Sequence, residues 1–400
     1  MRTTVTFGFN QIISHGFGLF LFAALVPLMQ ADIGISHWHL AAVGALTQLA
    51  YLAGAMMLGV IGRKVDSGRL LLLTGTLTSL LLFSMALLNN PNLMLVVLTV
   101  MAASAAVSWG GIVELVTCYG RPDQNATSLS TASSGTAWGY GLNGLLILVI
   151  VPLLGWRSGW LLAGALGLLT VLVTARVLRG IDKSAVQLTD LIDAPQVVST
   201  RELFRTVLRE RTAFSASLVC FLVGFSAMPY STWLNTWLAE QSLPPALGGY
   251  AWTIAGLTGM AAGFLVGKLA DKKGHGLALF ITCAGFAIAM LAFIHNPARF
   301  AVLAGFGYGL MYFPMWGIVA GWVSKRYHSK ATMQISGVGM VTFGLGGALG
   351  NLLAGSLQQV TGSLQAMYWV IGGTSLVLTM LAANIWQGER RIAPPLEPVL

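Results

Sequence analysis

Two ionisable side chains occur inside long apolar stretches of this sequence, where charge is costly. Glu114 is the exception among 13 acidic residues, since the others fall in loops, tails or the ends of apolar runs. His15 lies in the first apolar run, whereas the other histidines are at loops or run ends. A desolvated carboxyl or imidazole can titrate in the physiological range, so both are proton-coupling candidates. The alternatives are a salt bridge from Glu114 to Arg121 or Arg63, and a neutral His15 held by a Ser or Asn.

Other polar and aromatic side chains in the apolar runs are suited to line a path for a small molecule. Spacings of three and four residues predict that Asn10, Gln11 and Ser14 share one helical face with His15. Rings with an O–H or N–H suit a planar or partly apolar ligand, although Trp and Tyr also form belts at membrane surfaces. We expect the cavity role for Trp109, Trp138, Tyr230, Trp233, Tyr308, Tyr312 and Trp316, and the belt role for Trp160 and Trp237.

The apolar runs that carry these side chains have the length of membrane-spanning helices. Hydrophobic residues make up 56% of the chain and charged residues only 9%, compared with about 25% charged residues in a soluble domain. A helix needs roughly 20 apolar residues to cross a bilayer, and its backbone groups must pair internally there. Twelve spans are therefore predicted, at about 7–30, 37–61, 69–88, 92–118, 127–150, 157–178, 212–238, 246–269, 276–294, 298–324, 333–355 and 364–386.

The distribution of basic residues predicts the orientation of these spans. With a cytoplasmic N-terminus, every one of the 22 Lys and Arg residues except Arg157 and Arg299 falls on the cytoplasmic side. This asymmetry is the positive-inside signal. The net charge of +9 is thus explained by topology, and no nucleic-acid partner is expected. We predict an all-α, multi-pass protein of the cell inner (plasma) membrane, with both termini cytoplasmic.

The two halves of the chain repeat each other. Asp66 and Asp271, in two similar loops, are 205 residues apart, and the same offset carries Gly139 onto Gly344. A repeat of this length indicates two bundles of the same architecture. We expect a six-helix bundle at 1–179, a cytoplasmic linker at 180–211, a second six-helix bundle at 212–388 and a cytoplasmic tail at 389–400.

The loop from Gly267 to Gly274 reads GKLADKKG and resembles the Gly-x-Leu-x-Asp-(Arg/Lys)-x-Gly signature of the major facilitator superfamily. In the first copy, Ser67 replaces the base and Gly68 comes one residue early. We expect each loop aspartate beside the N-terminal end of the next helix, where the dipole favours negative charge. The resemblance covers nearly the whole chain, and it implies two bundles that rock about a mid-membrane site. It also implies a cytoplasmic latch between the halves, with simple topology determinants as the alternative; the latch candidates are Asp66, Arg69, Gly267, Asp271, Lys272 and Gly274.

These features predict a secondary active transporter of a small organic solute that works by alternating access with proton coupling. An uncoupled facilitator and a drug or metabolite efflux pump of the same fold are the alternatives. More distant alternatives are a copper carrier using Met311 and Met315, or a membrane protein that transports nothing. No catalytic motif occurs, so we expect no enzyme, and neither a cofactor nor a metal site. The expected partners are the substrate, the lipid bilayer and protons, and the expected state is a monomer.

Overall fold

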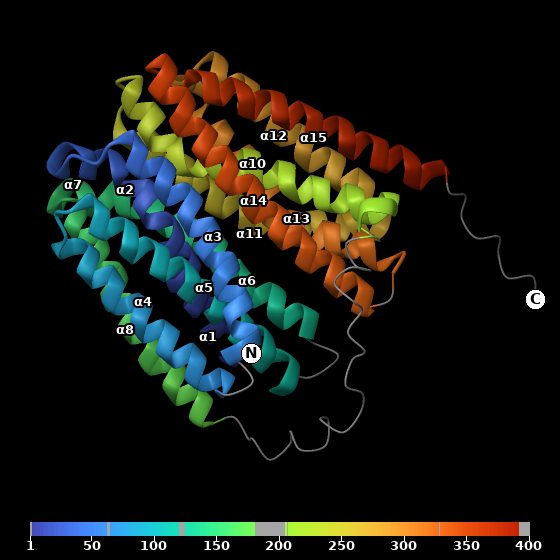
Figure 1. Ribbon diagram of the computed structural model, residues 1–400, viewed down its shortest axis with the longest axis horizontal. Helices are drawn as coiled ribbons and strands as arrows, with labels where there is room; N and C mark the ends of the chain where they lie inside the picture. The colour runs from blue at the N-terminus through green and yellow to red at the C-terminus, as the bar shows by residue number, and fades with distance from the viewer. Residues whose placement is uncertain are drawn as a thin grey trace, which may run out of the picture.

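The chain folds into long, roughly parallel helices (Figure 1). The computed structural model describes residues 2–61, 65–119, 125–180, 205, 207–327 and 329–391. Within these residues, twelve helical segments are long and apolar enough to cross a membrane, as predicted, and none of these residues is in a β-strand. Apolar side chains and a backbone whose polar groups pair within each helix both suit the hydrocarbon core of a membrane.

The first half contributes six spans, of which the first and the fifth are interrupted by π-helical turns. The first consists of α1 (Arg2–Gln11), η1 (Ile12–Phe17) and α2 (Gly18–Ile33), and it is followed by α3 (His37–Ile61), α4 (Ser67–Leu87) and α5 (Pro91–Tyr119). The fifth consists of α6 (Asn125–Leu145), η3 (Leu146–Ile150) and α7 (Val151–Leu154), and the sixth is α8 (Trp156–Arg179). Such π-turns are rare and frequently occur at functional sites.

The second half contributes six further spans. They are α10 (Arg211–Glu240), α11 (Pro245–Lys273), α12 (His275–His295), α13 (Pro297–Ser324), α14 (Ser329–Thr361) and α15 (Gln365–Arg391). The last helix therefore continues three residues beyond position 388, where we expected the second bundle to end.

The two loop aspartates have different positions relative to the helices. Asp66 caps α4, because its Oδ1 accepts a hydrogen bond from the Arg69 backbone N–H at 3.1 Å. This placement was predicted. Asp271 lies in the last turn of α11 and does not cap α12, although its charge acts on His275, the first residue of α12. The acid at the start of α12 is Glu389 of α15, whose Oε2 accepts from the Gly276 N–H at 2.8 Å.

Glycines bring the same helix pair together in each half. In the first half, a Cβ added to Gly16 would lie 2.5 Å from the Cα of Gly139 on α6. In the second half, Gly346 of α14 packs directly against the backbone of Phe221 on α10. Gly16 and Phe221 are again 205 residues apart. The repeat in the sequence is thus a repeat in packing, through small residues that let helix backbones approach closely.

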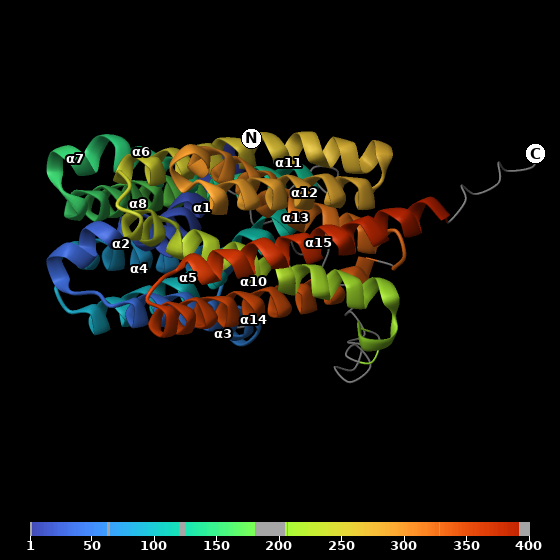
Figure 2. The same ribbon diagram turned by 90° about the horizontal axis from the view of Figure 1, so that it is seen from above.

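The two ends of the helix assembly differ in charge. We call the end where α1 begins and α8 and α15 finish the basic end; its exposed bases include Arg69, Arg176, Arg179, Arg211, Lys272, Arg326 and Arg391. The opposite, far end carries Arg157 and Arg299, at the starts of α8 and α13. In Figure 1 the two halves lie together at the far end and diverge toward the basic end, so that they form a V. Figure 2 shows the same helices from above, where those of both halves run roughly along the long axis of the assembly.

Candidate functional site

The two halves meet mainly along two helix pairs, α3 with α14 and α6 with α11, and α2 also contacts α10. On α14, Gly355 packs against Ala41 of α3, and on α11 a Cβ at Gly256 would lie 2.6 Å from the Ala137 carbonyl oxygen of α6. Gly355 and Ala41 lie near the far end, and the contacts of α6 with α11 run from the middle of these spans toward the far end, as far as Gly144 and Gly249. The far end of the path between the halves is therefore closed.

Hydrogen bonds add to this closure. The Asn235 side chain of α10 donates through Nδ2 to the Ala24 carbonyl oxygen of α2, at 2.5 Å across the two halves. The same side chain accepts from Nε1 of Trp252 through Oδ1, at 3.3 Å. A buried bond of this kind typically contributes about 0.5–1.5 kcal/mol. We call the contacts of Ala24, Asn235 and Trp252, together with Ala137 and Gly256, the far seal.

Next to the far seal lies a cluster of rings drawn from both halves. The Tyr140 hydroxyl of α6 and the Tyr308 hydroxyl of α13 are 2.7 Å apart. Tyr308 stacks between Tyr230, at 5.1 Å between ring centroids, and Tyr312, at 4.9 Å. Trp252 lies 4.7 Å from Tyr140. We call these five residues the aromatic cluster; no charged side chain belongs to it.

Tyr230 provides an open hydrogen-bonding position within the aromatic cluster. Its hydroxyl is buried and has no hydrogen-bond partner in the described part of the chain. An unsatisfied buried hydroxyl costs about 1–3 kcal/mol, so it favours a ligand that supplies an acceptor or donor. The predicted cavity residues Tyr230, Tyr308 and Tyr312 are thus brought together.

The other predicted cavity aromatics lie elsewhere. Trp233 donates through Nε1 to the Asn351 side chain at 3.1 Å, and Trp316 lies 5.2 Å from the ring of Phe343. Trp138 is 52% exposed, and Trp109 packs on a separate core cluster of the first half. Neither Trp109 nor Trp138 joins the aromatic cluster.

The belt role that we expected for Trp160 and Trp237 is wrong. Both side chains are fully buried. Trp237 stacks on Tyr368 of α15 with 3.8 Å between ring centroids, inside the second half. Their rings therefore stabilise the packing of the bundle and do not lie at a membrane surface. Met311 and Met315 are likewise buried core residues.

The polar residues of the first span do not share one face. Asn10 donates to Oγ1 of Thr174 on α8 at 2.8 Å, whereas Gln11 lies beside Thr136 of α6. His15 reaches a third neighbour, Tyr51 of α3. Adjacent residues on a helix differ by about 100° in direction, and the π-turn η1 shifts the register further. The predicted grouping of these side chains on one face is therefore wrong.

His15 lies in a defined hydrogen-bond chain. Ser14 Oγ donates to the Asn10 carbonyl oxygen at 2.8 Å, so it is available as an acceptor for Nδ1 of His15 at 3.0 Å. Nε2 of His15 lies 3.1 Å from the Tyr51 hydroxyl. In the neutral imidazole, Nδ1 then carries the proton and Nε2 accepts from Tyr51. A proton added at Nε2 would make the Tyr51 hydroxyl rotate to become an acceptor.

Glu114 is positioned differently from His15. It is exposed near the basic end of α5, and its Oε2 accepts a hydrogen bond from Ser67 Oγ at 2.5 Å. Ser67 is the first residue of α4, where the helix dipole favours a negative charge. Glu114 thus stabilises the start of α4 at the basic end, whereas His15 lies in the π-turn of the first span.

The latch candidates all lie at the basic end. Asp66, Arg69, Asp271 and Lys272 are exposed. A Cβ at Gly267 would meet nothing within 4 Å, so this glycine is not needed for close helix packing in this conformation. Gly274, in contrast, has φ of +102°, a conformation that other residues rarely adopt.

Some residues of the site were missed in the sequence. Tyr51, Tyr140, Asn235 and Trp252 all make the contacts described above, but none was a candidate. A usable signal existed for Tyr51 and Tyr140, because a tyrosine in the middle of a span needs a partner for its hydroxyl. The same holds for the amide of Asn235.

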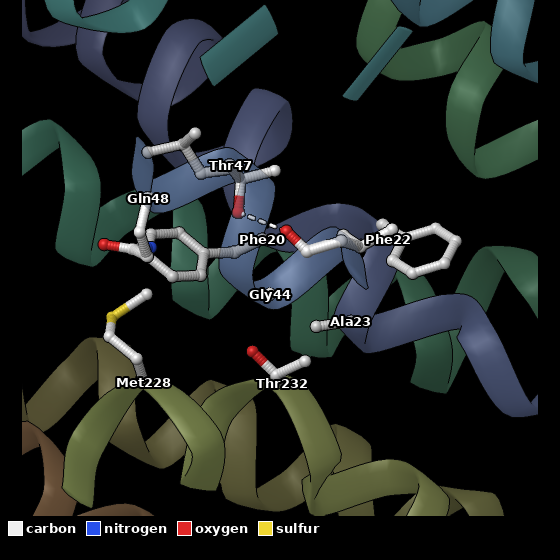
Figure 3. Close-up of a pocket in the computed structure, with 10 residues that line it drawn as sticks. Phe20, Phe22, Ala23, Gly44, Thr47, Gln48, Met228 and Thr232 are labelled. Atoms are coloured by element: carbon white, nitrogen blue, oxygen red, sulfur yellow. Dashed lines mark hydrogen bonds between the residues drawn. The ribbon is translucent and has the colours of Figure 1, made fainter. Parts of the chain in front are cut away.

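A small cavity lies between the halves next to the aromatic cluster (Figure 3). Phe20 and Gln48 line it from the first half, and Met228 and Thr232 from the second. The space open to the centre of a water molecule is about 20 Å³, enough for one or two waters. Phe20 also touches Tyr140, with 4.5 Å between ring centroids. The cavity therefore extends the aromatic cluster toward α3.

The sequence profile of the Major Facilitator Superfamily matches residues 9–316, more than half of the chain. This chain belongs to that superfamily. It is consequently a multi-pass membrane protein with the general character of a secondary transporter. A search of curated proteins gives no significant match.

Solved structures of the superfamily share the fold. The crystal structure of the nucleoside transporter NupG superposes with a TM-score of 0.74 at 16% identity, covering 97% of this chain and 100% of that one. A mutant of NupG gives a TM-score of 0.76 at 14% identity, covering 96% and 99%. At these identities the similarity concerns the fold of this superfamily member and not its substrate.

Proposed function

We propose that this superfamily member carries a small, uncharged organic solute with a planar ring, by alternating access and with proton coupling. The observation that carries this proposal is the aromatic cluster at the junction of the halves, with the unpartnered Tyr230 hydroxyl in it. Stacked rings accept planar apolar surface, and hydroxyls fix its orientation. A multiply charged solute would lack an opposite charge in this cluster.

The arrangement of the halves supports alternating access. They touch through the far seal and diverge at the basic end. We assign the basic end to the cytoplasm, because cytoplasmic loops carry the excess of Lys and Arg. The conformation is then inward-facing, in the inner membrane. The moving bodies are the bundles at 1–179 and 212–388, joined by the linker at 180–211.

The latch follows as the counterpart of the far seal. In the outward-facing state the basic ends must approach, which would bring the loops of Asp66 and Asp271 toward the opposite half. Arg69 and Lys272 are the bases beside these acids. Their contacts would then stabilise the state in which the far seal is open.

His15 is the first candidate for proton coupling. It touches Tyr51, and the next residue, Leu52, lies against Gly344 of α14 at the junction of the halves. Protonation of His15 would therefore rotate the Tyr51 hydroxyl on α3, and α3 is a helix that contacts the second half. Glu114 is the second candidate, because a carboxyl at the basic end could exchange protons with the cytoplasm. If both residues were purely structural, the protein would be an uncoupled facilitator.

Nucleosides are the first solutes to test, since they combine a planar base with a neutral sugar and the structurally similar NupG is a nucleoside transporter. A bound solute raises the unfolding temperature of purified protein, and the rise grows with the logarithm of the solute concentration once this exceeds the dissociation constant. We expect stabilisation by neutral planar solutes and a weaker effect in Tyr230→Phe, which lacks only the hydroxyl. Tyr250→Phe is the matched control, because Tyr250 is exposed on α11.

Transport is then measured in liposomes with and without a pH gradient. Uptake that responds to the gradient supports proton coupling, whereas equal uptake in both conditions supports the facilitator. Stabilisation by charged solutes alone, with no effect from neutral planar ones, would contradict the proposed substrate class.

A further inference from the structure

A second, larger pocket opens at the basic end, away from the aromatic cluster. It lies wholly in the second half, between the first turns of α10, the end of α13 and the last turns of α15, which come together in Figure 1. The space open to the centre of a water molecule is about 530 Å³. Sites for small ligands typically measure roughly 300–1,000 Å³.

The open end of this pocket is strongly basic. Arg211 and Arg391 line it from α10 and α15, Arg326 lines it from the turn that follows α13, and all three are exposed. The acid in the lining is Glu389, whose carboxylate already accepts the Gly276 N–H of α12. Arg211 also opens the 30-residue α10, so the positive end of the helix dipole adds to the charge.

The wall of the pocket changes character along α15. From Arg391 to Leu381 is ten residues, or about 15 Å along the helix. The deeper wall is largely apolar, because Leu381, Ile385 and the buried Trp322 of α13 line it, with Ser215 and Asn384 as the polar residues at this depth. The pocket is therefore charged at the surface of the assembly and apolar toward the membrane interior. A ligand that fits it along its whole length is amphipathic.

We infer that this pocket binds a phosphate-bearing anion, and that its occupant is the head group of an anionic phospholipid. Arginines are the preferred partners of phosphate oxygens, since their planar guanidinium groups form paired hydrogen bonds. Basic pockets between spanning helices are known to suit anionic lipid head groups. The apolar wall accommodates the glycerol and the first acyl carbons, which a soluble organic phosphate does not have. This site is independent of the transported solute.

The test uses the delipidated full chain in an uncharged detergent and measures bound lipid by native mass spectrometry. The probes are phosphatidylglycerol, zwitterionic phosphatidylcholine and glycerol 3-phosphate. We expect phosphatidylglycerol to bind most tightly, and to bind roughly tenfold or more weakly to Arg326→Gln/Arg391→Gln. The matched control is Arg176→Gln/Arg179→Gln, which removes two exposed arginines from the same end in the first half. It should leave the affinity within about twofold, since it does not touch the pocket.

Each other outcome has a defined meaning. Equal weakening in the two double variants, or equal binding of phosphatidylcholine and phosphatidylglycerol to the wild type, would overturn the site. If glycerol 3-phosphate bound as tightly as phosphatidylglycerol and with the same dependence on the arginines, the lipid assignment would be overturned in favour of a soluble organic phosphate. Should the glutamine variant fail to fold, Arg326→Lys/Arg391→Lys keeps the charge but loses the paired hydrogen bonds, and it should bind phosphatidylglycerol more weakly than wild type.

Discussion

Substituting Gly256 by alanine should open the far seal. A Cβ at this position would lie 2.6 Å from the Ala137 carbonyl oxygen and 2.7 Å from the Cα of Gly141, both of which are backbone atoms of the other half. Backbone atoms cannot rotate away, so the halves must separate. Overpacking of this kind costs about 1–3 kcal/mol. Because 1.4 kcal/mol corresponds to a factor of ten, the ratio of open to sealed molecules should rise roughly 5- to 150-fold.

Gly263→Ala on the same helix provides the control. A Cβ there would meet nothing within 4 Å, while the gain in helix propensity, about 1 kcal/mol, is the same in both variants. Spin labels at Asn92→Cys and Gln241→Cys, exposed positions at the far end of the two halves, report the separation by pulsed electron paramagnetic resonance. In the labelled protein the native Cys118, Cys220 and Cys283 are replaced by serine. We expect a longer distance in Gly256→Ala and an unchanged one in Gly263→Ala. Identical distributions in the two variants would refute the role of the far seal.

Three further changes test other parts of the structure. Tyr140→Phe removes the hydrogen bond to Tyr308, which contributes about 0.5–1.5 kcal/mol, so the ratio of open to sealed molecules in the spin-label distance distribution should rise roughly two- to tenfold; an unchanged ratio would mean that this bond does not hold the halves together. Gly274→Ala places a side chain at φ of +102° and should cost about 1–3 kcal/mol, seen as a lower unfolding temperature than in Gly263→Ala. Tyr230→Phe should weaken stabilisation by a neutral planar solute, and equal loss in Tyr250→Phe would contradict a direct contact.

The architecture was predictable because it depends on the hydropathy and the repeat of whole helices, and these do not depend on the positions of single side chains. Apolar length predicted twelve spans, and His37–Ile61 was placed to the residue. The 205-residue repeat predicted two bundles of the same architecture, and in both halves the first and fifth spans pack through glycine, as Gly16 does on Gly139 and Gly346 on Phe221. Hydropathy and internal repeats describe whole helices, so a shift of a few residues at a helix end changes neither of them.

The loops and the first span were less predictable, because the direction of a side chain depends on the local backbone. Asp66 caps α4 as expected, but α11 continues past Asp271, and Glu389 from another part of the chain takes the equivalent role. Asn10 and His15 are five residues apart, so an α-helix alone turns them about 140° from each other, and the π-turn η1 changes the register of the residues after Gln11. No spacing rule for an α-helix anticipates an extra residue in one turn.

The site was only partly predictable, because it forms between the halves. Tyr308 and Tyr312 were candidates from their spacing on one helix, and they do stack. Their partner Tyr140 comes from the other half of the chain, and a contact between distant helices leaves no periodic signal in one sequence. Trp237 was misassigned for the same reason. Its position near a helix end indicated a ring at the membrane surface, but Tyr368 of another helix stacks on the ring inside the second half.

The most direct test of proton-coupled transport is to measure proton movement driven by the solute. Purified protein is placed in liposomes that contain a pH-sensitive dye, and a solute that stabilises the protein is added outside. We expect the wild type to move protons together with the solute. In His15→Gln we expect this proton movement to be lost while solute exchange across the membrane continues. Proton movement that is undiminished in His15→Gln, or absent from wild type that transports the solute, would contradict the proposed role of His15.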